Sequence, residues 1–168
     1  MLKSNKPIIY IGIDPGMNGA IATSCQGVVH AYKMPDGPKA IYSLLKTLKE
    51  KHIPVCCVER TGWHFPGNAI AASNKFTAHV AQIHACLEIL NISYESIAPQ
   101  KWMKEFLRKT TTLKHTNLDD QKQRDKLKRK RKNAIKDKAK KLFKDETITL
   151  TTSDAYGILW VLMENRKT

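Results

Sequence analysis

Three acidic residues, Asp14, Glu59 and Asp154, stand at places where carboxylates could act together. Asp14 ends a continuous apolar run, residues 8–13, which predicts a strand buried on both faces. Glu59 ends a second apolar run, residues 55–58, and Asp154 lies in the first turn of a predicted C-terminal helix. Adjacent strand ends lie close together in an open sheet, and a helix can present a third carboxylate to the same point. We therefore expect one cluster.

Such a cluster predicts a magnesium site. Carboxylates brought together repel one another, and a hard divalent cation that prefers oxygen ligands relieves the repulsion. Two such ions can activate a water and stabilise a departing phosphate oxygen, so the chemistry expected is phosphodiester hydrolysis with Mg²⁺, for which Mn²⁺ can substitute. Taken singly, each residue has an ordinary explanation. Asp14 can form a turn, Glu59 can pair with Arg60, and Asp154 can cap its helix.

The elements that would position these residues form an α/β pattern. Residues 8–13, 20–24 and 28–34 predict three strands of an antiparallel meander, and a helix begins at Pro38. Further predicted elements follow in the order strand, helix, strand and helices: residues 55–58, 68–90, 94–97, 118–143 and 153–165. This order predicts a five-stranded mixed sheet flanked by helices, in a single domain spanning residues 1–168.

A strongly basic segment, residues 108–144, holds nearly all of the net charge. It contains 16 Lys and Arg against four Asp, which is +12 of the chain's +14. Its middle, residues 126–132, has too few apolar residues to be well buried. Such an excess attracts polyanions, most commonly nucleic acid, although basic membrane-associated and ribosome-associated proteins share it. We expect phosphate contacts from Lys128, Arg129 and Arg131.

Four further residues are candidates for contact with DNA. Trp63 and Phe65 follow the Glu59 strand in a loop with Gly and Pro, where aromatic rings can stack on unpaired bases or else cover the core. Lys101 and Lys104 can contact phosphate or stabilise transition-state charge, or can be ordinary surface lysines.

Other residues argue against competing chemistries. The four cysteines have no CxxC spacing and have apolar neighbours, which predicts reduced thiols and no zinc site. His79 and His84 are five apart, a poor spacing for two ligands on one helix face. Trp102 and Trp160 are expected to be packing residues. No signal peptide or membrane-spanning run is visible, so we expect a cytoplasmic, DNA-associated protein without membrane partners.

Four motifs, in order along nearly the whole chain, resemble those of the RuvC-like Holliday junction resolvases, especially phage-type members. They are Ile11-Gly12-Ile13-Asp14-Pro15-Gly16 with Gly19; Val58-Glu59; Ala98-Pro99-Gln100-Lys101-Trp102; and the helix pair Lys138-Ala139-Lys140-Lys141-Leu142-Phe143 and Ser153-Asp154-Ala155-Tyr156-Gly157-Ile158.

The resemblance implies an RNase H-like fold and a homodimer that nicks a four-way DNA junction symmetrically, in recombination and repair. The products would carry 5′-phosphate and 3′-hydroxyl ends. Asp14, Glu59 and Asp154 match the family's catalytic carboxylates, which would hold two Mg²⁺ per site. The helix over residues 68–90 is the expected dimer face. One departure is Thr151, where many members have an acidic or His ligand, so a hydroxyl or another group would complete the second metal site.

Two alternatives stay open. One is a different RNase H-like nuclease that acts on RNA–DNA hybrids, flaps or pre-ribosomal RNA. The other is a non-catalytic protein that binds branched DNA, which the threonine at position 151 allows. An actin-like ATPase is excluded because the chain is too short for the two domains that bind nucleotide between them.

Overall fold

The computed structural model of this chain describes residues 6–61, 70–108 and 121–167. The elements in these ranges confirm the predicted order. They are β1 (Ile8–Asp14), β2 (Ala20–Cys25), β3 (Val28–Lys33), α1 (Gly37–Lys51), β4 (Ile53–Glu59), α2 (Ile70–Ile89), β5 (Tyr94–Ile97), α3 (Pro99–Leu107), α4 (Gln121–Leu142) and α5 (Ser153–Glu164).

The five strands form one mixed sheet in the order β3-β2-β1-β4-β5. β1 pairs with β2 and β2 with β3 in antiparallel fashion, which confirms the predicted meander. β4 pairs with β1, and β5 with β4, in parallel. The carboxyl ends of β1, β4 and β5 therefore meet at one edge of the sheet.

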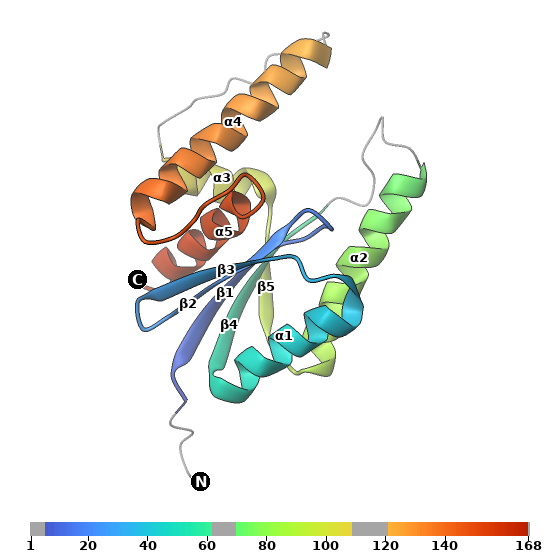
Figure 1. Ribbon diagram of the computed structural model, residues 1–168, viewed down its shortest axis with the longest axis vertical. Helices are drawn as coiled ribbons and strands as arrows, with labels where there is room; N and C mark the ends of the chain where they lie inside the picture. Colours follow the sequence, from blue (N-terminus) through green and yellow to red (C-terminus); the bar gives the residue numbers. More distant parts are fainter. Residues whose placement is uncertain (1–5, 62–69, 109–120, 168) are drawn as a thin grey trace.

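Helices cover both faces of the sheet (Figure 1). α1 and α2 lie on one face, over an apolar cluster that includes Ile11, Ile41 and Ile83. α5 packs on β1, β2 and β4 on the other face, and α3 and α4 pack against α5. The cluster on this second face includes Trp102 and Tyr156. β1 is thus buried from both sides, as its continuous apolar run predicts.

Gly12 lets α5 lie directly on β1. A Cβ at this position would lie 2.6 Å from the backbone nitrogen of Leu159 and 2.8 Å from the carbonyl oxygen of Ala155. Real side chains do not tolerate such distances, so glycine is required here. The close approach brings the first turn of α5, which carries Asp154, toward the end of β1.

Most differences from the predicted elements are at their ends. α2 and α4 begin at Ile70 and Gln121, because residues 68–69 and 118–120 lie outside the described residues. The structure adds α3 as a separate helix that begins at Pro99, whose fixed φ suits a first helical turn.

The cysteines fit the prediction of reduced thiols. All four are free, and Cys56, Cys57 and Cys86 are buried. Over the described ranges, no helix combines the length and the apolar character needed to cross a membrane.

Candidate functional site

The parallel pairing of β1 and β4 places Asp14 beside Glu59. Ile13 is the register partner of Val58, and in each strand the next residue is the carboxylate. Both acids terminate their strands and both are half-buried. The sheet itself therefore sets these two side chains next to each other at its carboxyl edge.

α5 supplies the third carboxylate. Asp154 lies in the first turn of this helix, where a negative charge also favours the helix dipole. Its side chain is 16% exposed. Because α5 packs on both β1 and β4, its first turn faces the same edge as the two strand ends.

The pKa values of the three acids are all raised, mainly by burial. Burial, followed by the negative charges of Asp154 and Glu59, raises the pKa of Asp14 from its ordinary 3.8 to about 8, although Lys132 opposes the rise. Burial also raises the pKa of Glu59, and the charge of Asp154 adds to that rise. The structure thus places Asp154 and Glu59 near enough to Asp14 for their charges to raise its pKa.

Protein donors already contact two of these carboxylates. The indole Nε1 of Trp102 donates a hydrogen bond of 2.6 Å to Glu59 Oε2. Ser153 Oγ donates one of 3.3 Å to Asp154 Oδ1, and Lys132 Nζ lies 3.7 Å from Asp154 Oδ2. Burial raises the pKa of Asp154, while the ammonium of Lys132 and the Ser153 bond lower it.

The donor types fit a hard cation, and the mutual repulsion of three half-buried acids is what such a cation relieves. Within residues 6–61, 70–108 and 121–167, however, no three His, Cys, Asp or Glu side chains are grouped closely enough to hold a metal ion as they stand. The carboxylates would have to turn toward a shared ion, and Lys132 would have to release Asp154.

A cleft of about 660 Å³ opens at this edge of the sheet. Its lining includes the acids Glu59 and Asp154 and the cations Arg60, Arg131 and Lys132. The other lining residues come from the segment after β4, the segment before α3, and α2, α3 and α4: Thr61, Phe76, Ala98, Pro99, Gln100, Trp102, Met103 and Ile135. The cleft thus combines acids that can hold a cation with basic groups that can hold an anion.

Two solved structures resemble this arrangement over almost their whole length. Thermus thermophilus RuvC in complex with a Holliday junction substrate superposes with a TM-score of 0.58, at 11% identity, over 95% of this chain and 96% of that one. Another Thermus thermophilus RuvC structure gives a TM-score of 0.54 at 9% identity, over 95% and 97% of the two chains. The chain has a RuvC-like fold. No protein-family model and no curated protein matches the sequence.

The RuvC-like fold confirms the predicted RNase H-like architecture, a five-stranded mixed sheet flanked by helices. Figure 1 shows what the fold places around the carboxylates. α4 and α2 both extend past the carboxyl edge of the sheet, one on each side of it. Both helices contribute to the lining of the cleft, α2 through Phe76 and α4 through Arg131, Lys132 and Ile135.

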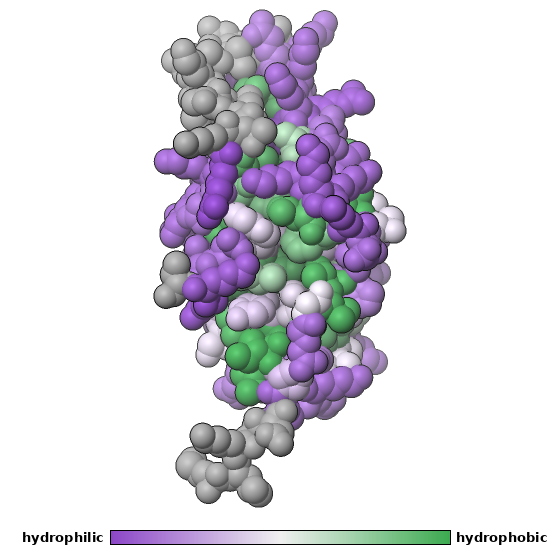
Figure 2. Space-filling model, turned by 90° about the vertical axis from the view of Figure 1, so that its left-hand side faces the viewer, coloured by the Kyte–Doolittle hydropathy of each residue, from purple (hydrophilic) through white to green (hydrophobic). Residues whose placement is uncertain are grey.

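The predicted phosphate-binding residues fall into two groups. Arg131 is half-buried and lines the cleft. Lys128 and Arg129 are exposed on α4, and hydrophilic side chains gather at the upper right of the face in Figure 2. Lys101 and Lys104 are exposed on α3, but neither lines the cleft.

Two further predictions concern the aromatic pair Trp63 and Phe65 and the hydroxyl of Thr151. Trp63 and Phe65 lie outside the described residues. Thr151 is half-buried in the turn before α5. The hydroxyl that contacts Asp154 is that of Ser153, so the side chain next to the acid provides the local hydrogen bond.

The sequence analysis missed three residues that touch the acids. Ser153 directly precedes Asp154, and its position before an acid was the only signal available. Lys132 ends a run of five consecutive basic residues that nothing in the sequence tells apart. Trp102 was predicted to be a packing residue. It is buried at 1% exposure, as expected, but its polar edge also contacts Glu59.

Proposed function

We propose that this protein is a structure-specific endodeoxyribonuclease that resolves four-way DNA junctions. One observation carries the proposal: in a RuvC-like fold, Glu59 and Asp154 line a cleft together with basic side chains, and the charges of these two acids raise the pKa of the neighbouring Asp14. A phosphodiester substrate needs both halves of this arrangement. Its phosphates need positive groups to bind them, and its hydrolysis is assisted by metal ions that carboxylates hold.

Asp14, Glu59 and Asp154 would hold two Mg²⁺ ions, or Mn²⁺ in their place. When bound, these ions would lower the pKa of the attacking water and stabilise charge on the departing oxygen. The water oxygen would bond to phosphorus as the bond from phosphorus to the 3′-oxygen breaks, and the departing oxygen would take up a proton to balance the one that the water loses. The products are a 3′-hydroxyl and a 5′-phosphate.

The basic residues would bind and orient the substrate. Arg131 and Lys132 face the cleft beside the acids, where they can neutralise the phosphates around the scissile bond. Lys128 and Arg129 extend the basic surface along α4. Such backbone contacts position DNA without reading its sequence.

Symmetric nicking needs two sites, and we propose that α2 joins two copies of the chain. α2 exposes small side chains at spacings of three and four residues, at Ala78, Ala81 and Ala85, followed by Ile89, which is 69% exposed. Small residues let two helices approach closely. The same helix lines the cleft through Phe76, so a partner packed on α2 would present a second site to another strand of the junction.

The test is cleavage of a synthetic four-way junction, with products mapped to single nucleotides. We expect paired nicks at symmetric positions with Mg²⁺, ending in 5′-phosphate and 3′-hydroxyl groups. Asp14→Asn is expected to abolish cleavage while junction binding persists. Asp36→Asn is the matched control, because Asp36 is exposed and makes no side-chain capping bond at the start of α1.

Other outcomes identify the alternatives. Faster cleavage of an RNA–DNA hybrid or a flap would indicate a different RNase H-like nuclease. Binding without turnover in either Mg²⁺ or Mn²⁺ would indicate a structure-specific DNA-binding protein. Undiminished cleavage by Asp14→Asn would overturn the assignment of the metal site.

A further inference from the structure

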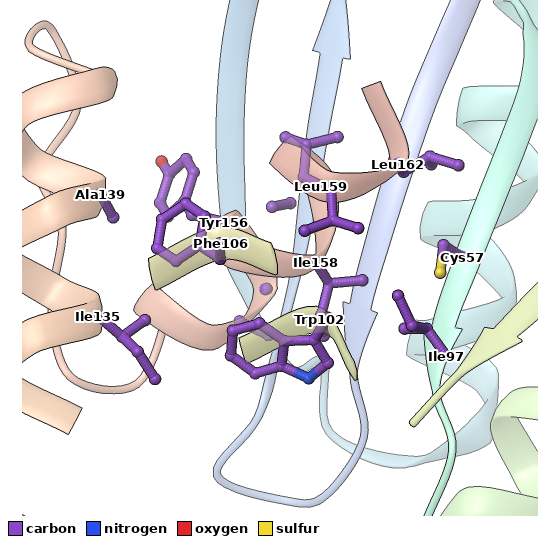
Figure 3. Packing of buried hydrophobic residues seen from close by; sticks show 14 of the residues in the cluster. Cys57, Ile97, Trp102, Phe106, Ile135, Ala139, Tyr156, Ile158, Leu159 and Leu162 are labelled. Carbon is purple, nitrogen blue, oxygen red and sulfur yellow. The ribbon is translucent and has the colours of Figure 1, made fainter. Parts of the chain in front are cut away.

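Trp102 joins the apolar core to the candidate site through a single polar atom. Its side chain is 1% exposed and packs in the cluster beneath α4 and α5, with its ring centroid 6.5 Å from that of Phe106 (Figure 3). Its indole nitrogen donates the 2.6 Å hydrogen bond to Glu59 Oε2. The residue therefore lies mostly in the core, while its N–H reaches a carboxylate at the cleft.

The backbone of α5 fixes where the indole lies. A Cβ on Gly157 would come within 2.6 Å of Trp102 Cζ3 and 3.1 Å of Cε3, so the ring occupies the space that a side chain at position 157 would need. Gly157 is three residues after Asp154 on the same helix. The ring thus spans from α5, which carries one acid, to Glu59 on β4.

We propose that Trp102 is a positioning residue that holds the Glu59 carboxylate in place for the metal; this rests on the proposed function. An indole N–H can only donate, so it orients the carboxylate without competing for the cation. The bond engages Oε2, and a carboxylate has a second oxygen to offer. Outer partners that orient metal ligands in this way typically matter about 10–100-fold for metal affinity or activity.

The simpler explanation is that Glu59 only satisfies a buried N–H, which a tryptophan in a core usually needs. Under that explanation, removing the N–H would change stability and leave the chemistry of the folded protein unchanged. The two explanations therefore differ in metal dependence, which a purely structural role would not alter.

The kinetic test compares Trp102→Phe with Trp160→Phe. Trp160 is the matched control, because it belongs to the same apolar cluster and contacts Phe106 at 5.6 Å between centroids, but it faces Arg108 and Lys138 instead of an acid. For Trp102→Phe we expect kcat at low Mg²⁺ to fall about 10–100-fold. The junction KM should stay unchanged, and raising the Mg²⁺ concentration should restore much of the rate. Trp160→Phe should resemble the wild type.

A second readout needs neither a variant at position 102 nor cleavage. The chain has three tryptophans, so its ¹H–¹⁵N spectrum has three indole signals. Trp63→Phe and Trp160→Phe each remove one signal, and the signal that remains in both variants is that of Trp102. Adding Mg²⁺ without DNA should shift the Trp102 indole signal and leave that of Trp160 in place. This measurement decides the matter even if Trp102→Phe does not fold.

The outcomes are distinct. A Trp102 signal that stays still while Mg²⁺ activates cleavage would overturn the proposal, and so would a folded Trp102→Phe variant with wild-type metal dependence. A wild-type protein that cleaves no junction would refute the proposed function. In that case the indole shift on adding Mg²⁺ would still show whether Trp102 orients a metal-binding carboxylate.

Discussion

Lys132 Nζ on α4 lies 3.7 Å from Asp154 Oδ2 on α5. The ammonium lowers the pKa of all three acids of the site and so partly offsets their repulsion. Its side chain is 53% exposed, which leaves it free to turn toward solvent or a phosphate. The positive charge that partly neutralises the acids in the DNA-free protein is therefore carried by α4, the helix proposed to bind DNA.

This pair predicts competition between Lys132 and Mg²⁺. In Lys132→Gln, the carboxylate of Asp154 is released and no ammonium repels the cation, so Mg²⁺ binding without DNA should tighten. If the exposed ion pair is worth about 0.5–1 kcal/mol, its loss should lower the Kd for Mg²⁺ about two- to fivefold. Isothermal titration calorimetry measures the change. Lys140→Gln, at an exposed position further along α4, should bind as the wild type does. Weaker binding by Lys132→Gln would show that the lysine assists the metal instead.

The fold was largely predictable because its signals are local and strong. The buried run over residues 8–13, the period of α1 and the turn at Gln26-Gly27 each determine a short element by themselves. The positions of Asp14 and Glu59 were predictable for a related reason. A carboxylate that ends an apolar strand must lie at the sheet edge, and parallel pairing of the two strands brings both acids to the same edge.

The partners of the acids were not predictable, because they depend on how distant elements pack. Trp102 reaches Glu59 only because Gly157 admits its ring against α5, a contact across 55 residues of sequence. Lys132 differs from its basic neighbours only in the direction it faces, which is set where Ile135 and Ala139 are buried on α4. Neither relationship has a signature in local sequence.

The raised pKa of Asp14 predicts how stability depends on pH. A carboxyl that keeps its proton in the folded protein up to about pH 8, but loses it near its ordinary 3.8 when unfolded, stabilises the fold at low pH. That stability is lost as pH rises between these values. Without metal, Asp14→Asn should therefore raise the melting temperature relative to the wild type at pH 8, by the equivalent of at least about 1.4 kcal/mol, one pKa unit. The gain should shrink toward pH 4.

Comparing the two proteins at each pH isolates Asp14. Burial lowers the pKa of His79, for example, so that group acts in the opposite direction in both proteins. Added Mg²⁺ should remove the advantage of Asp14→Asn at pH 8, because the cation neutralises the acids in the wild type. Equal melting temperatures at pH 8 without metal would contradict the raised pKa.

The basic surface of α4 predicts a steep dependence of DNA binding on salt. Replacing Lys128 and Arg131 by Gln should reduce the slope of log Kd against log salt by about 1.8, if each neutralises one phosphate. Fluorescence anisotropy with a labelled junction at several salt concentrations measures the slope. Replacing Lys39 and Lys51 is the control, because both are exposed on α1, which covers the opposite face of the sheet. An unchanged slope in the α4 variant would place the DNA elsewhere.

Gly12 predicts that a single methyl group would separate α5 from β1. In Gly12→Ala, the new Cβ would lie 2.6 Å from one backbone atom of α5 and 2.8 Å from another, and backbone cannot rotate away as a side chain can. We expect a loss of about 1–3 kcal/mol, as for other overpacked cores, in urea-induced unfolding. Gly27→Asn is the control, because no atom lies within 4 Å of a Cβ there. Any side chain is strained at its φ of +84°, but asparagine is one of the residues most often found at positive φ, so we expect a smaller loss than for Gly12→Ala. The folded fraction of Gly12→Ala should also cleave more slowly, since α5 carries Asp154 away from Asp14 as it shifts. Wild-type stability together with wild-type cleavage would mean that the contact of α5 with β1 does not hold the acids together.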